Sequence, residues 1–181
     1  MKTKDMVLTG MLTAVLAVLS IIQIPMPSGV PITLQTFAVA LCGYVLGKKK
    51  GTLATVLYVV IGTIGIPVFA GMTGGFSCLI GPTGGFIYGF IFLAFFSGAG
   101  MKNKNKVISV AFGVVGLAIC HLLGALQFSI VTSTGFGASI MLVSVPYLLK
   151  DVLSVIGAMV VAIAVRKGLA GANLLSEEQV A

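Results

Sequence analysis

Charged side chains are almost absent from this sequence, and their scarcity limits what the chain can fold into. Its 181 residues include 11 Lys and Arg and 4 Asp and Glu, a charged share of 8%, while 58% of the residues are hydrophobic. Soluble domains carry roughly 25% charged residues. A water-soluble protein needs a polar surface that this composition does not supply, so the sequence predicts an integral membrane protein. It excludes a disordered chain, and three cysteines exclude a disulfide-stabilised secreted domain.

Six apolar stretches are candidates for membrane-spanning helices. A helix needs about 20 apolar residues to cross a hydrocarbon layer about 30 Å thick. The candidates cover residues 6–24, 32–47, 52–70, 84–99, 107–128 and 145–165. We therefore expect an all-α bundle of six transmembrane helices, which forms a membrane domain over residues 1–167. Residues 168–181 are more polar and are expected to form a short cytoplasmic tail.

Basic residues alternate with the apolar stretches and predict the orientation of the bundle. Ten of the eleven lie on one side, at Lys2, Lys4, Lys48, Lys49, Lys50, Lys102, Lys104, Lys106, Arg166 and Lys167. By the positive-inside rule, both termini are cytoplasmic. The same residues should contact anionic membrane lipids. This distribution explains the net charge of +7 without a nucleic-acid partner.

The other three connections are rich in Gly and Pro but apolar. They cover residues 25–31, 71–85 and 132–139, and the string Thr73-Gly-Gly-Phe76 recurs as Thr83-Gly-Gly-Phe86. Apolar irregular backbone at a membrane surface is typical of loops that fold back over a cavity. Flexible turns with no cavity beneath them are the alternative.

The eleventh basic residue, Lys150, is followed directly by Asp151 inside the sixth stretch. Ionisable residues in a membrane helix are costly and usually mark a functional site. Helical spacing places Tyr147, Asp151 and Ser154 on one face, which predicts a small-molecule pocket at the outer end of this helix. Neighbouring helical residues point about 100° apart, so Lys150 and Asp151 are not expected to pair well with each other. An interfacial Lys that reaches the lipid headgroups is the alternative.

Several further polar residues lie in the outer halves of the apolar stretches. Gln35 and Tyr88 are expected to join the same pocket. His121 is expected to be a hydrogen-bond partner between helices, because this is the commoner role of a lone membrane histidine. Small residues recur in the first stretch at Gly10, Ala14 and Ala17, a spacing that permits close helix approach. That approach serves either the protein's own bundle or a partner membrane protein.

Sequence motifs for catalysis are missing. The run from Gly43 to Lys49 is one residue short of a P-loop and lacks its hydroxyl residue, so we expect no ATP hydrolysis by this chain. No G-x-S-x-G nucleophile motif is present, and no His, Cys and acidic residues have metal-ligand spacing. The sequence therefore predicts no catalytic residues, no metal site and no enzyme.

Three strings resemble the BioY family. They are Val30-Pro-Ile-Thr-Leu-Gln-Thr-Phe-Ala-Val39, Gly65-Ile-Pro-Val-Phe-Ala-Gly71 and Gly81-Pro-Thr-Gly-Gly-Phe-Ile-Tyr-Gly-Phe90. BioY proteins are the biotin-specific membrane subunits (S components) of energy-coupling factor (ECF) transporters. The resemblance extends over nearly the whole chain in length, expected spans and motif order. The family often has Pro-Gly-Asp-x-x-Lys in the sixth span, whereas here Asp151 matches the Asp and Ser154 replaces the Lys.

The resemblance implies a function and partners. It implies a biotin-binding subunit of the bacterial cell membrane that acts with a transmembrane coupling protein and two cytosolic ATPases. It needs no cofactor, because biotin is the transported ligand. The resemblance also implies that Gly10, Ala14 and Ala17 face the coupling protein. An S component for another vitamin, a small membrane enzyme and a stand-alone carrier or channel are the alternatives.

The chemistry of biotin indicates which groups the pocket should offer. Its ureido ring has two N–H donors and one carbonyl acceptor, and its apolar chain ends in a carboxylate. Asp151 or Gln35 would accept from the ring, and Phe37, Phe69 or Tyr147 would form apolar walls. Lys150, or backbone N–H groups of Gly74 and Gly75, would bind the carboxylate. Which residue meets which end of biotin remains open at this level.

Overall fold

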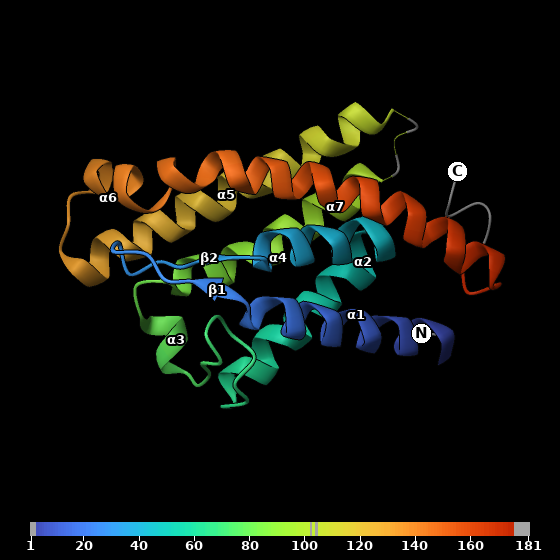
Figure 1. Ribbon diagram of the computed structural model, residues 1–181, viewed down its shortest axis with the longest axis horizontal. Helices are drawn as coiled ribbons and strands as arrows, with labels where there is room; N and C mark the ends of the chain where they lie inside the picture. Colours follow the sequence, from blue (N-terminus) through green and yellow to red (C-terminus); the bar gives the residue numbers. More distant parts are fainter. Residues whose placement is uncertain (1–2, 102, 104, 176–181) are drawn as a thin grey trace.

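The computed structural model describes residues 3–101, 103 and 105–175, and it is a bundle of long helices (Figure 1). The helices are α1 (Thr3–Ile21), α2 (Gln35–Thr63), α3 (Ser77–Ile80), α4 (Gly84–Gly100), α5 (Lys106–Thr132), α6 (Phe136–Val143) and α7 (Val145–Gly171). Two short strands, β1 (Gln23–Ile24) and β2 (Ile32–Thr33), pair antiparallel between α1 and α2. The long helices correspond to the apolar stretches of the sequence.

Three of the helices, α1, α5 and α7, are long and apolar enough to cross a membrane by length and composition. The helix α4 is equally apolar but shorter. Large apolar side chains cover the outside of the bundle, as at Val107, Ile130 and Leu149, each more than 70% exposed. An exposed apolar surface on this scale is suited to lipid rather than water. The mostly helical architecture and these spans agree with the membrane protein that the composition predicted.

The second and third predicted spans are the two halves of α2, which contains a sharp reversal at Gly47. Gly47 has a positive φ of 76°, a conformation that a residue with a Cβ adopts only with strain. One residue therefore turns the chain, and the expected loop at Lys48–Lys50 is wrong because these lysines begin the second half of α2. That half ends at Thr63 rather than near residue 70, before an irregular segment that contains Gly65 and Pro67.

The helices α4 and α5 pack closely along much of their length, and α2 packs against α4. Gly89 lies where α4 meets α5, and a Cβ there would overlap the backbone of Cys120. Such close backbone approach is typical of membrane helices. In lipid there is no hydrophobic driving force between helices, so they associate through van der Waals contact, which small residues make possible. The core around this contact contains fully buried side chains such as Tyr44, Tyr58 and Leu93.

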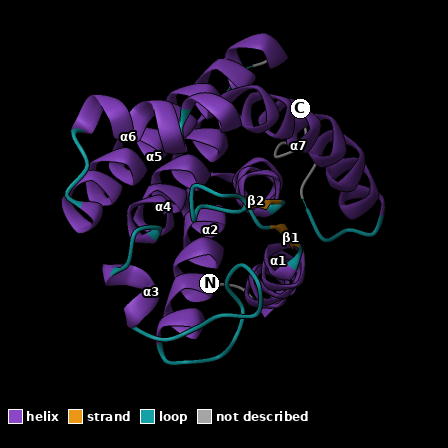
Figure 2. Cartoon of the chain, turned by 60° about the vertical axis from the view of Figure 1, so that its left-hand side comes forward, coloured by secondary structure: helices purple, strands orange, loops and turns teal. Residues whose placement is uncertain are grey.

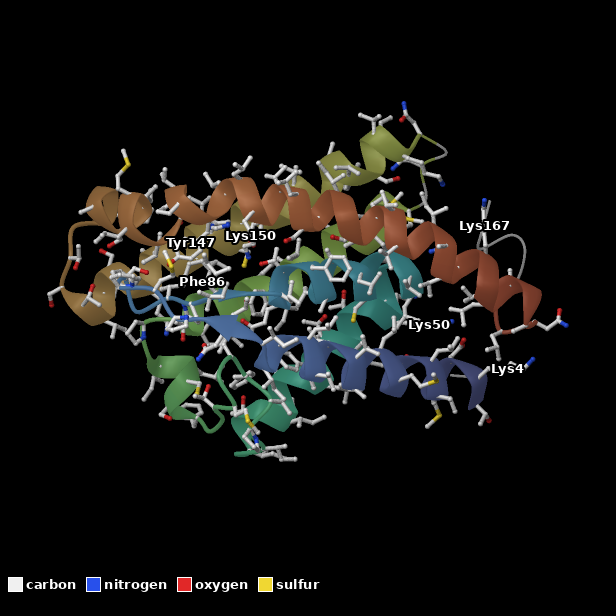
Figure 3. The ribbon with its side chains drawn as sticks, viewed as in Figure 1. Lys4, Lys50, Phe86, Tyr147, Lys150 and Lys167 are labelled. Atoms are coloured by element: carbon white, nitrogen blue, oxygen red, sulfur yellow. The ribbon has the colours of Figure 1, made fainter. Side chains whose placement is uncertain are left out.

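Lys4, Lys50 and Lys167 lie toward one end of the bundle, as their labels in Figure 3 show. Lys50 forms an ion pair with Asp5 at 2.5 Å, and Lys4 donates to the carbonyl of Asn173. Arg166 Nη1 donates to the carbonyl oxygens of Tyr44 and Val45 at 2.8 and 3.3 Å. These carbonyls lie at the end of the first half of α2, where a helix lacks internal partners. Lys2, Lys102, Lys104, Glu177 and Glu178 lie outside the described residues.

The last helix is longer than its apolar stretch. It continues to Gly171, inside the segment that was expected to be a tail, and residues 172–175 turn back onto it. The amide of Leu174 donates to the carbonyl of Leu169, and Leu175 is buried against the core. The first four residues of the expected tail are therefore helical, because Arg166 and Leu169 pack against the bundle.

The opposite end holds the short elements that the sequence did not predict (Figure 2). The β1–β2 pair aligns Gln23 with Thr33 and Ile24 with Ile32, so residues 25–31 form a hairpin loop. The helices α3 and α6 also lie at this end. Together these elements close the bundle above the site described next.

Candidate functional site

A cavity of about 270 Å³ lies beneath the 25–31 loop, among α2, α4, α5 and α7. A typical small-molecule site is a cavity of this kind, with apolar walls and a few polar groups. Its lining residues are Gln23, Gly29, Val30, Pro31, Thr33, Gln35, Thr36, Phe69, Ala70, Thr73, Cys78, Thr83, Phe86, Ile87, Phe90, Leu117, Cys120, His121, Val143, Tyr147, Lys150 and Asp151. The labelled Phe86, Tyr147 and Lys150 lie close together in Figure 3, away from Lys4 and Lys167.

Asp151 is the most deeply buried charge of the cavity wall, at 5% exposure. His121 Nε2 lies 3.2 Å from its Oδ2 atom, and the Lys150 ammonium contacts its Oδ1 atom. Thr36 lies beside the same carboxylate. A buried carboxylate needs such partners, because removing them would leave a costly uncompensated charge.

Lys150 and Asp151 are thus in contact, and the expectation that they would not pair well is wrong. The long, flexible stem of Lys150 brings the ammonium back to its neighbour, so the angle between their Cβ atoms does not decide the contact. The same ammonium donates to the carbonyl of Thr33 at 3.1 Å. Lys150 therefore ties α7 to β2 as well as neutralising Asp151.

The loop over the cavity is held by Tyr147, one turn before Asp151. The Tyr147 hydroxyl donates to the Val30 carbonyl at 2.5 Å and is hydrogen-bonded to the Ser28 hydroxyl at 2.7 Å. These contacts fix both the loop and the aromatic ring. The predicted face of α7 that contains Tyr147 and Asp151 is therefore the face that closes the cavity.

The wall formed by α2 is also fixed by hydrogen bonds. Gln35 Nε2 donates to the Tyr58 hydroxyl at 2.8 Å, and Gln35 Oε1 accepts from the Thr33 hydroxyl at 3.2 Å. The Tyr58 ring packs edge to face against Phe69, with centroids 5.4 Å apart. This network orients Gln35 and presents the Phe69 ring as an apolar wall.

The structure brings five of the predicted binding residues to the cavity, namely Gln35, Phe69, Tyr147, Lys150 and Asp151. Their helices converge at this end, and the hydrogen bonds described above orient most of their polar groups. Ser154, Tyr88, Phe37, Gly74 and Gly75 are not among the residues that line it.

The structure gives a geometric reason for four of these five. Tyr88 is 40% exposed and lines a shallow groove between α4 and α5, because its neighbours Ile87 and Phe90 face the cavity instead. Phe37 packs near Gly157 of α7. The amide of Gly75 donates to the carbonyl of Gly62, and Gly74 packs against the backbone of Ile66, so both glycines serve loop packing.

Other lining residues were missed by sequence reasoning. Thr33, Thr36 and Phe86 lie in the strings that resemble BioY, but they carry no charge that would separate them from packing residues. His121 was expected to bridge helices, and its contact with Asp151 does join α5 to α7. Its position on the cavity wall required the tertiary structure.

The fold and the cavity together define an α-helical membrane protein with a cavity that suits a small molecule. The chain belongs to the BioY family, whose model matches residues 1–171. A biotin transporter BioY of Thermotoga maritima is 39% identical over 91% of this chain and 96% of its own length. A probable biotin transporter BioY of Pyrococcus horikoshii is 34% identical over 90% of this chain and 96% of its own.

A solved structure shares the fold. The crystal structure of the S-component for biotin from an ECF-type ABC transporter superimposes with a TM-score of 0.84 at 25% identity. The match covers 92% of this chain and 92% of that chain. The family and the resemblance drawn from the three sequence strings are thus confirmed.

Proposed function

We propose that this chain is a biotin-binding S component of an ECF-type uptake transporter. Its relatives are named as biotin transporters, and the matching crystal structure is of an S-component for biotin. The observation that carries the proposal is the charged pair Lys150–Asp151 in the wall of a buried cavity of a BioY-family chain. Such a pair suits a ureido ring, whose N–H groups need an acceptor and whose carbonyl needs a donor.

The chemistry of biotin fits the described walls. Asp151 and Gln35 offer acceptors to the ureido N–H groups, and the Lys150 ammonium beside Asp151 offers a donor to the ureido carbonyl. Phe69, Phe86 and Tyr147 supply apolar surface for the rings and the chain. Lys150 takes the place of the cation that the family often has at the position of Ser154, which does not line the cavity. The chain therefore keeps an Asp–cation pair, with the cation one residue before the Asp instead of three residues after it.

We infer six membrane spans from the same evidence: α1, the two halves of α2, α4, α5 and α7. The basic end of the bundle, with both termini, is placed in the cytoplasm by the positive-inside rule and faces anionic lipids of the cell membrane. The cavity then opens toward the outer surface. The membrane domain is residues 1–167, and the cytoplasmic tail over 168–181 starts within the last turns of α7.

The partners of this subunit are a transmembrane coupling protein and two cytosolic ATPases. Gly10 and Ala14 are exposed on α1, and nothing lies within 4 Å of a Cβ built at Gly10. Gly10 and Ala14 therefore do not serve helix packing within the bundle itself. Ala17 is half-buried and packs against the core. We assign Gly10 and Ala14 to the contact with the coupling protein.

We expect the double variant Gly10→Leu with Ala14→Leu to lose the coupling protein while keeping biotin. The added side chains fill the space that a close helix approach needs, which should weaken co-purification about tenfold or more. Copy numbers after tandem purification from co-expressing cells measure the effect. Ala118→Leu, the same change at an exposed site of α5, is the control. If the double variant recovers as much coupling protein as the unmodified chain and Ala118→Leu do, Gly10 and Ala14 do not form the docking surface.

Isothermal titration of the purified protein tests the ligand directly. Biotin is expected to bind with one-to-one stoichiometry, whereas riboflavin and thiamin are not. Binding of another vitamin with no binding of biotin would replace biotin in the proposal. Biotin uptake by cells that lack every ATPase partner would instead indicate a stand-alone carrier.

A further inference from the structure

His121 is a buried polar residue on the cavity wall. Its contact with Asp151 joins α5 to α7, and the same contact has a consequence for ligand binding. It lies in the middle of α5, is 6% exposed, and lines the cavity. Its ring packs edge to face against Phe86, with centroids 5.8 Å apart and an interplanar angle of 90°. The imidazole is therefore held in one orientation by packing, with one nitrogen directed at Asp151.

The two nitrogens of this imidazole have different surroundings. Nε2 lies 3.2 Å from Asp151 Oδ2, whereas Nδ1 is buried and has no hydrogen-bond partner among the described residues. A neutral imidazole carries one N–H, and a buried donor without an acceptor is costly. The proton therefore belongs on Nε2, where the carboxylate accepts it.

This hydrogen bond leaves the two carboxylate oxygens with different tasks. His121 occupies Oδ2, and the Lys150 ammonium lies beside Oδ1. The ammonium reaches Oδ1 and the Thr33 carbonyl together, because it has three N–H donors. A carboxylate oxygen can accept two hydrogen bonds, so Oδ1 keeps one acceptor position for a donor on a ligand.

We propose that His121 is a positioning residue for the ligand: by donating Nε2–H to Asp151 Oδ2 it holds the carboxylate so that Oδ1 accepts an N–H group of the ureido ring. This inference rests on the proposed function. Without the imidazole, the carboxylate can rotate toward the Lys150 ammonium and bind it through both oxygens. Recognition of the ureido ring then has to break that arrangement.

Matched substitutions separate this role from simple packing. His121→Gln keeps a nitrogen donor near the place of Nε2, whereas His121→Met keeps a flexible side chain without a donor. In titrations with biotin, we expect His121→Met to bind about tenfold more weakly and His121→Gln to stay within about threefold of the unmodified protein. Two biotin analogues, each methylated at one ureido nitrogen, complete the comparison. One of the two analogues lacks the N–H group that Asp151 Oδ1 accepts. The unmodified protein and His121→Met should bind that analogue with about equal affinity.

The outcomes are distinct. If the unmodified protein does not bind biotin, the proposed function and this inference both fall. If it binds biotin and His121→Met binds equally well, only the inference falls. If His121→Met and His121→Gln bind biotin equally weakly, the shape of the imidazole matters rather than its N–H donor. The same conclusion follows if His121→Met weakens the binding of biotin and of both analogues by the same factor.

A second measurement does not require any variant to fold. His121 is the single histidine of the sequence, so ¹⁵N-labelled histidine gives one set of imidazole signals in protein purified through a tag without histidine. At about pH 8, where imidazole is normally neutral, we expect protonated Nε2 and unprotonated Nδ1. The Nε2 signal should shift when biotin is added. A proton on Nδ1, or signals unchanged by saturating biotin, would overturn the proposal.

Discussion

Replacing Asp151 by asparagine is expected to weaken biotin binding about tenfold or more, which corresponds to about 1.4 kcal/mol. The carboxylate is buried, accepts from His121 and neutralises Lys150. The amide has one acceptor oxygen in place of two and carries no charge, so a charge-assisted bond to a ligand N–H becomes a weaker neutral one. The Lys150 ammonium also loses its counter-charge. Isothermal titration in detergent measures the change.

Ser154→Ala is the matched control for this variant. Ser154 lies one turn further along α7, is half-buried, and does not line the cavity. Its loss should leave the affinity for biotin unchanged, even though the family often has a lysine at this position. Unchanged affinity in Asp151→Asn, with monodisperse elution of both variants, would limit Asp151 to helix packing with His121 and Lys150.

The second large effect is expected at Gly89, where one added methyl group should destabilise the whole bundle. A Cβ at Gly89 would overlap the Cα and side chain of Cys120, so α4 or α5 has to shift to accept it. Overpacking of this kind typically costs about 1–3 kcal/mol, and the shift of α4 would also displace Phe86 and Phe90 from the cavity. We therefore expect Gly89→Ala to lower both the melting temperature and the affinity for biotin.

Gly168→Ala is the comparison that makes this prediction specific. Gly168 is helical, and nothing lies within 4 Å of a Cβ built there. Alanine favours a helix over glycine by about 1 kcal/mol, so this variant should be equally or more stable. Opposite signs for the two substitutions in a detergent melting experiment are the expected result. Equal melting temperatures would mean that α4 and α5 do not approach each other as closely at Gly89 as described.

Sequence reasoning identified the helices more successfully than their connections. The apolar stretches 84–99, 107–128 and 145–165 became α4, α5 and α7, because long runs of apolar residues have one favourable structure in lipid. A connection after Gly47 was predicted, but its reduction to one residue was not, because a single glycine with positive φ leaves no signal beyond the residue itself. The β1–β2 pair was missed because two-residue strands are too short for any periodicity.

The candidate site divides in a similar way. Asp151 and Lys150 were identified from sequence, because a charge in an apolar helix is expensive and therefore noticeable. Tyr147 followed from its helical spacing to Asp151. Tyr88 was assigned to the pocket from its depth in the helix alone. Depth does not determine the direction of a side chain, and Tyr88 lines the groove between α4 and α5 instead. His121 could not be placed on the cavity wall until the distance from α5 to α7 was known.

The sequence by itself determined that this chain is a membrane protein, that its basic residues gather at one end, and that Lys150 and Asp151 are its unusual charges. Those conclusions depend on the cost of transferring each residue from water to lipid, which is a property of composition and order along the chain. The tertiary structure alone decided which polar atoms face each other in the cavity. Its contacts join residues far apart in sequence, such as His121 with Asp151 and Tyr147 with Val30, and they depend on helix rotation and close backbone packing.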